Sequence, residues 1–301
     1  IIDFGRTPNT KHQKPNTKHQ KPNTKHETPN TKHQKPNTKH ETRNAKHQTP
    51  ILMDALLALE DGRTFTCRSF TGPGEATGEV VFNTSMTGYK EVLTDPSYSG
   101  QMVVMTYPLI GNYGINPEDV ESDRIQVAAF IIKEYQPYPS NYRSTASLAD
   151  YLIDQNIMGV EGLDTRAITR HIRNAGAMRA VISTEAITPD SLVQRANEIP
   201  KMAGLNLANV VTTPEPFYWE NGKLEIINPD RYALDKTIWR HRGRKRSVIA
   251  FDFGIKFNIL RQLEKIGFEM VVVPSNTTAD TIEAMAPDGI FLSNGPGDPE
   301  P

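Results

Sequence analysis

The chain has 301 residues, enough for two domains of ordinary size. Its net charge of −1 averages two unlike parts, because residues 1–52 carry 11 Lys and Arg against 3 Asp and Glu, and the rest carries 23 against 32. The acidic remainder argues against a nucleic-acid partner, since phosphate binding needs clustered Lys and Arg. A single cysteine, Cys67, excludes an internal disulfide and a zinc cluster and fits a cytoplasmic location. No apolar run approaches the roughly 20 residues of a membrane helix, so we expect no membrane association.

A seven-residue repeat fills the N-terminal part of the chain. The unit PNTKHQK begins at Pro8 and recurs, with small changes, as far as residue 49. The repeats contain no Leu, Ile, Val or Phe, and nearly all carry a proline, so they favour neither a coiled coil nor a core. We expect residues 1–52 to be a low-complexity tract that is disordered or not native, with Met53 as the native first residue.

Histidine recurs in every repeat, from His12 to His47. Such a tract could bind a metal ion loosely, and its Lys-His pairs could hold a nucleic acid weakly. A non-coding repeat translated ahead of the true start explains the tract without any function. We favour that interpretation and predict neither a metal site nor a nucleic-acid partner.

The sequence from Met53 to residue 190 predicts a mixed α+β domain, because strand patterns come first and helix patterns follow. The strands are a hairpin around an Asp61-Gly62 turn and the runs 78–85, 101–108 and 126–135. The helices begin at three capping signals, which are Ser147 with Asp150, Asp164, and Thr188 before a proline.

Residues 78–114 hold more hydroxyl and amide side chains than a simple connection needs, so they are either plain surface or a binding edge. Their sequence GEVVFNTSMTGYKEVLTDPSYSGQ strongly resembles the N-terminal domain of the carbamoyl-phosphate synthetase small subunit. The resemblance continues through LDTRAITRHIR and AGLNLANVVTT and extends from Met53 to Pro301. It implies that Ser97, the serine of LTDPSYS, contacts a bound L-glutamine. The alternative is that Ser97 is a turn residue that bonds its own backbone.

Residues 191–246 are expected to connect this domain to a second one, over 247–301. There the sequence alternates strand, helix, strand, helix and strand, which predicts the start of a parallel α/β sheet. The last strand runs into the turn NGPGDP. Ligands of such sheets lie at the carboxyl ends of the strands, and glycines let a backbone approach a ligand closely.

This second region resembles the opening of a class I glutamine amidotransferase domain, in the segments AFDFGIKFNILR and DGIFLSNGPGDP. The resemblance implies that Gly295 and Gly297 bind L-glutamine. The catalytic Cys, His and Glu of that family lie beyond residue 301, so we expect no catalytic residue in the chain as given and predict it to be inactive alone. Cys67 in an alternating strand and His171 on an apolar helix face are interpreted as packing residues.

The function that the resemblance implies is that of an enzyme, the glutamine-hydrolysing small subunit. It would pass ammonia to a large subunit, which uses ATP, magnesium and potassium to make carbamoyl phosphate for arginine and pyrimidine biosynthesis. The chain would need no cofactor of its own. Two alternatives stay open, another class I amidotransferase and a non-catalytic docking module for the large subunit. Other amidotransferases share the glycine turn but lack GEVVFNTSMTGY.

Overall fold

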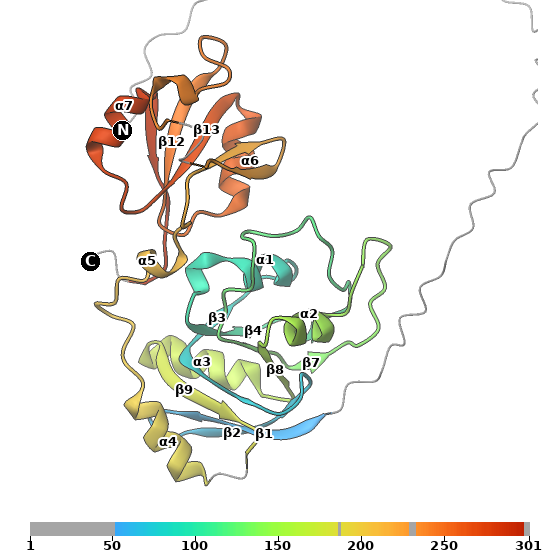
Figure 1. The fold of residues 1–301 in the computed structure, drawn as a ribbon. Helices are drawn as coiled ribbons and strands as arrows, with labels where there is room; N and C mark the ends of the chain where they lie inside the picture. The colour runs from blue at the N-terminus through green and yellow to red at the C-terminus, as the bar shows by residue number, and fades with distance from the viewer. Residues whose placement is uncertain (1–51, 186–187, 229–232, 298–301) are drawn as a thin grey trace, which may run out of the picture. The chain divides into compact units, whose positions relative to one another are not determined.

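The computed structural model describes residues 52–185, 188–228 and 233–297 (Figure 1), and these residues belong to one compact unit. The repeat tract, with the expectation that it is disordered, lies outside them. The described residues form a closed barrel with its flanking helices and a separate five-stranded sheet. The structure is therefore a mixed one of strands and helices, as the sequence predicted.

Seven strands close the barrel in the order β1-β2-β8-β6-β4-β3-β9. Their bounds are Met53–Leu59 (β1), Thr64–Ser69 (β2), Glu75–Asn83 (β3), Gln101–Met105 (β4), Ala129–Ile131 (β6), Met158–Glu161 (β8) and Met178–Ser183 (β9). Strands β1 and β2 form the predicted antiparallel hairpin, with Gly62 at a φ of 93° in its turn. Strands β3, β4, β6 and β8 pair in parallel. Strands β8 and β9 were not predicted from the sequence, and both are needed to close the barrel.

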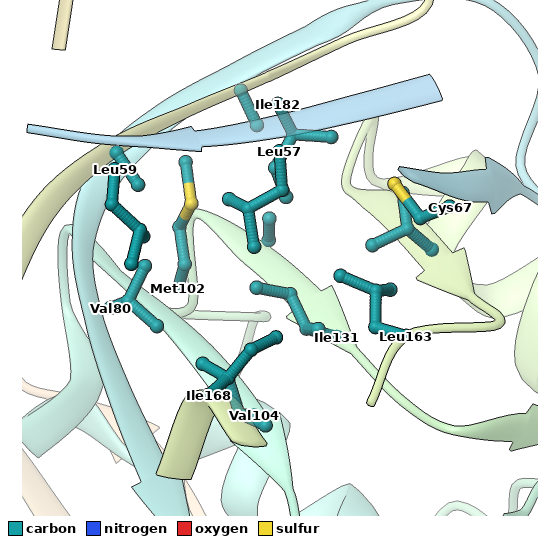
Figure 2. Close-up of a cluster of buried hydrophobic side chains, with 14 of the residues drawn as sticks. Leu57, Leu59, Cys67, Val80, Met102, Val104, Ile131, Leu163, Ile168 and Ile182 are labelled. Atoms are coloured by element: carbon teal, nitrogen blue, oxygen red, sulfur yellow. The ribbon is translucent and has the colours of Figure 1, made fainter. Parts of the chain in front are cut away.

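The barrel interior is filled by apolar side chains from all seven strands and from one helix (Figure 2). Alternation along β1 decides which side chains enter, since Leu57 and Leu59 point inward while Ala58 packs on the outside. Helix α3 (Thr165–Ala175) adds Ile168 to the same core. The core therefore joins the seven strands to the helix that lies between β8 and β9 in the chain.

Short helices and turns complete the described structure, and one of the turns, at Ile238, packs on the five-stranded sheet and not on the barrel. The helices are α1 (Tyr89–Thr94), α2 (Leu148–Asp154), α4 (Pro189–Glu198) and α5 (Ala208–Val211), with 3₁₀ turns η1 (Pro96–Tyr98) and η2 (Lys236–Ile238) and a small sheet of β5 (Leu109–Ile110) and β7 (Glu134–Tyr135). The predicted capping residues are confirmed, because the side chains of Ser147, Asp164 and Thr188 each accept a hydrogen bond from a backbone N–H in the first helical turn. No helix in the described part of the chain is long and apolar enough to cross a membrane.

The five-stranded sheet has the order β11-β10-β13-β12-β14. Strands β12 (Arg246–Asp252), β13 (Phe268–Pro274) and β14 (Gly289–Leu292) are parallel, as predicted. Strands β10 (Phe217–Glu220) and β11 (Lys223–Ile226) continue the sheet in antiparallel pairing. They come from residues 191–246, so part of the segment expected to connect the two domains belongs to this sheet.

Two helices cover opposite faces of the sheet. Helix α7 (Ala279–Met285) packs Ile282 and Met285 on the face that carries Ile249, and helix α6 (Phe257–Lys265) packs Leu260 on the face that carries Val248. The apolar spacing of Phe257, Leu260 and Leu263 continues to Ile266, but α6 ends at Lys265 and the Ile266 side chain is 70% exposed.

The N-terminus of α6 is held by a loop of the barrel. The residue at its N-cap, Lys256, makes no side-chain capping bond. Instead, the backbone carbonyl of Glu121 accepts from Phe257 N at 2.9 Å, and Glu121 Oε2 accepts from Asn258 N at 2.8 Å. Glu121 N in turn donates to Thr94 Oγ1 at 2.9 Å. The first N–H groups of a helix have no partner within it, so the barrel loop supplies partners that α6 lacks.

We expect the two substitutions Glu121→Ala and Glu121→Gln to differ. Alanine removes the acceptor of Asn258 N and should lower the free energy of unfolding by about 0.5–2 kcal/mol. Burial raises the pKa of Glu121 in the folded protein. The folded state therefore binds the proton more readily than the unfolded chain does. At a pH above the raised pKa the carboxylate is the populated form, and its burial lowers the free energy of unfolding. Glutamine keeps an acceptor without the charge, so Glu121→Gln should be as stable as the parent or more stable at neutral pH.

Urea unfolding followed by circular dichroism measures both variants. Equal destabilisation by alanine and glutamine would show that the contact depends on the charge and not on the acceptor.

Candidate functional site

The candidate site lies at the carboxyl ends of β12 and β14. Strand β12 lies between β13 and β14. The chain therefore passes from β12 to β13 on one side and then crosses to β14 on the other side of β12. Ligands of open α/β sheets bind in the crevice at such a reversal of strand order. A cavity of about 420 Å³ opens there, lined by Asn206, Leu207, Ala208, Asn209, Phe253, Ser275, Ser293, Gly295, Pro296 and Gly297.

The two predicted glycines both line this cavity. A Cβ on Gly295 would lie 2.2 Å from the carbonyl oxygen of Phe253, so only glycine lets the turn approach the end of β12 this closely. Gly297 has a φ of 77°, in the left-handed region that favours glycine. A Cβ there would also lie 3.0 Å from Leu207 Cδ1. Both glycines thus meet a packing demand of the turn itself, and their contact with glutamine stays a prediction.

The turn after β12 is organised by the buried carboxylate of Asp252. Its oxygens accept from Gly254 N at 2.9 Å, from Ile255 N at 2.8 Å and from Thr213 N at 2.7 Å. Phe253 N donates to Ser293 Oγ at 3.0 Å. The ends of β12 and β14 are therefore tied together at the floor of the cavity.

Ser97 is brought to the start of the glycine turn, although it lies far from it in the sequence. Its backbone N donates to Asp95 Oδ1 at 2.9 Å, which is the local turn bond, while its hydroxyl oxygen accepts from Asn294 Nδ2 at 3.1 Å. Asn294 directly precedes Gly295. The backbone of Ser97 therefore serves its own turn, and its hydroxyl contacts the residue before the glycine turn, although neither Ser97 nor Asn294 lines the cavity.

Other lining residues of the cavity were not predicted from the sequence as site residues. Asn206 and Asn209 come from the segment around α5, and Ser275 follows β13. Ser275 Oγ donates to Asn209 Oδ1 at 3.1 Å. Among the residues that the structure describes, those that line the cavity are not ionisable and offer amide, hydroxyl and backbone groups, which suit a carboxamide. Asn206 and Asn209 belong to AGLNLANVVTT, a segment of the family resemblance in which nothing local indicates a ligand.

Cys67 and His171 lie away from this cavity. The Cys67 side chain is buried in the barrel core, and burial raises the pKa of its thiol to about 12. His171 Nε2 lies 2.6 Å from Asp61 Oδ2, so this side chain ties α3 to the β1–β2 turn. Within the ranges that the structure describes, no three His, Cys, Asp or Glu side chains gather as ligands of a metal ion.

Comparison with known proteins gives the class first. Residues 249–301 match the family model of class I glutamine amidotransferases. Residues 57–182, which hold most of the barrel, match the model of the carbamoyl-phosphate synthase small chain, CPSase domain.

Curated relatives agree with both models, and each of the following is a carbamoyl phosphate synthase small chain. The protein of Syntrophotalea carbinolica is 55% identical over 83% of this chain and 64% of its own length. That of Solidesulfovibrio magneticus is 54% identical over 82% and 64%, and that of Aquifex aeolicus 50% identical over 82% and 64%. The chain belongs to the family of carbamoyl-phosphate synthase small chains. It spans 64% of the length of these relatives.

We expect the Cys67 thiol to be unreactive in the folded protein. A free thiol titrates near about 8.5, whereas burial raises the pKa of Cys67 to about 12. The thiolate needed for alkylation is therefore scarce across neutral and mildly alkaline pH. Labelling by iodoacetamide, followed by intact mass, should be slow in native buffer and complete in denaturant. Fast native labelling would contradict the buried position of the thiol.

Proposed function

We propose that the chain binds L-glutamine at the glycine turn, as part of a small chain that supplies ammonia from glutamine for carbamoyl phosphate synthesis. The observation that carries this proposal is the position of the Ser97 hydroxyl, 3.1 Å from Asn294 at the start of that turn. Ser97, Gly295 and Gly297, the residues that the family resemblance assigns to glutamine, come from distant segments, and Ser97 lies within reach of the turn that carries the glycines. The uncharged cavity beside the turn is a second support.

A carboxamide suits this site because it both donates and accepts hydrogen bonds. Backbone N–H groups of the glycine turn would bind its oxygen, and the Ser97 hydroxyl would hold a second polar group of the ligand. Glutamate would bind less well at the same position, since its side-chain carboxylate would enter a cavity whose described lining residues, up to Gly297, include no cation. The proposed preference is therefore for the amide over the acid.

Hydrolysis of the amide needs an activated nucleophile, a proton shuttle and donors for the oxyanion. The one cysteine of the 301 residues is buried in the barrel core and stays protonated. We therefore assign glutamine binding to these residues, and we assign the nucleophile to the segment that follows the glycine turn in family members. The proposed ammonia acceptor is a large subunit that uses ATP, magnesium and potassium, in a cytoplasmic complex that serves arginine and pyrimidine biosynthesis.

We expect the purified chain to bind L-glutamine without releasing glutamate. Isothermal titration calorimetry should give a measurable Kd for L-glutamine and a weaker one for L-glutamate. Loss of one hydrogen bond in Ser97→Ala should raise the glutamine Kd about two- to tenfold.

Three outcomes contradict the proposal. The first is the absence of glutamine binding, and the second is binding that Ser97→Ala leaves unchanged. The third is release of glutamate that disappears in Cys67→Ala, because it would make the buried thiol a nucleophile.

A further inference from the structure

Asp95 holds two partners from different parts of the molecule. Its Oδ1 accepts from Ser97 N at 2.9 Å, and its Oδ2 lies 2.7 Å from Lys256 Nζ. The Asp95 side chain is only 12% exposed, whereas that of Lys256 is 33% exposed. Ion pairs in water contribute little, but here one largely buried carboxylate makes a charge-assisted contact and fixes a turn with the same group.

Lys256 belongs to the connection that builds the other side of the site. It follows directly on the turn after β12 that Asp252 organises, and it stands at the N-cap of α6. Within that turn, Gly254 has a φ of 116° and packs between Pro96, next to Ser97, and Pro296 of the glycine turn. A Cβ on Gly254 would lie 3.2 Å from Pro96 Cβ and 3.1 Å from Pro296 Cδ. The turn η1, which carries Ser97 and is called the Ser97 turn below, and the glycine turn therefore both pack against Gly254.

We propose that Asp95, paired with Lys256, is a positioning residue that fixes the Ser97 hydroxyl at the glycine turn. The effect on L-glutamine rests on the proposed function, whereas the contacts of Asp95 with Ser97 and Lys256 do not depend on it. Phe257 N and Asn258 N, bonded to Glu121, anchor α6 to the barrel loop. That anchor holds the N-terminus of α6 near the barrel, and the Asp95–Lys256 pair then orients the turn that carries Ser97. Without the pair, the Ser97 turn keeps its backbone bond but loses its link to the β12–α6 connection.

The test uses substitutions that separate charge from hydrogen bonding. Asp95→Asn keeps an acceptor for Ser97 N and removes the charge of Asp95. Lys256→Met removes the cation, whereas Lys256→Arg keeps a cation at the same position. Lys265→Met is the matched control, because Lys265 is an exposed lysine in the last turn of the same helix. Circular dichroism confirms that each variant is folded before its binding is measured.

The first readout is the glutamine Kd from calorimetry. Asp95→Asn and Lys256→Met should each raise it about two- to tenfold, as Ser97→Ala does. The double variant of Asp95 and Lys256 should be no weaker than either single one, since both remove the same link. Lys256→Met should add nothing to Ser97→Ala, Lys256→Arg should lie near the parent, and Lys265→Met should match it. A general loss of structure would produce neither this coupling nor the rescue by arginine.

The second readout does not need glutamine. Amide hydrogen exchange over 95–99 should become faster in Lys256→Met and stay unchanged in Lys265→Met. If the parent binds no glutamine, the proposed function fails and exchange alone decides the role of Asp95. If the parent binds glutamine and Ser97→Ala weakens it, but Lys256→Met changes neither Kd nor exchange, the positioning role is overturned while the proposed function stands.

Discussion

The exposed end of one helix governs the geometry of the candidate site. The first N–H groups of α6 have no partner within the helix, and Lys256 at the N-cap provides no side-chain acceptor. Glu121, from a loop of the barrel, accepts from Phe257 N and Asn258 N and so anchors the helix. Because α6 follows directly on the turn after β12, this anchor also fixes that turn, on which Gly295 packs with no space for a Cβ.

The barrel gives the Ser97 turn its rigidity. That turn leads into β4, which pairs with β3 on one side and with β6 on the other and is almost completely buried. The Thr94 hydroxyl binds the loop that carries Glu121. A hydroxyl at the end of such a scaffold has little freedom to move, which is what a binding site needs if it is to recognise a ligand without reorganising. The barrel therefore supplies position and not chemistry.

The electrostatics of the site favour recognition over reaction. The lining residues within the described part of the chain are uncharged, and neither Asp95 nor Lys256 is one of them. The only thiol of the chain is kept protonated in a core that excludes water. A neutral cavity accepts an amide more easily than an acid, because a buried carboxylate without a partner is costly. These features agree with the assignment of glutamine binding to these residues.

Local pattern was enough to predict most single elements. The Asp61-Gly62 hairpin, the caps at Ser147, Asp164 and Thr188, and the parallel strands β12, β13 and β14 follow from alternation and capping signals that involve neighbours in sequence. Resemblance, and not pattern, singled out Ser97, Gly295 and Gly297. Closure of the barrel through β8 and β9, the addition of β10 and β11 to the sheet, and the meetings of Ser97 with Asn294 and of Asp95 with Lys256 depend on the tertiary structure. They join residues distant in the chain, and no periodicity within a segment records which distant segment it will contact.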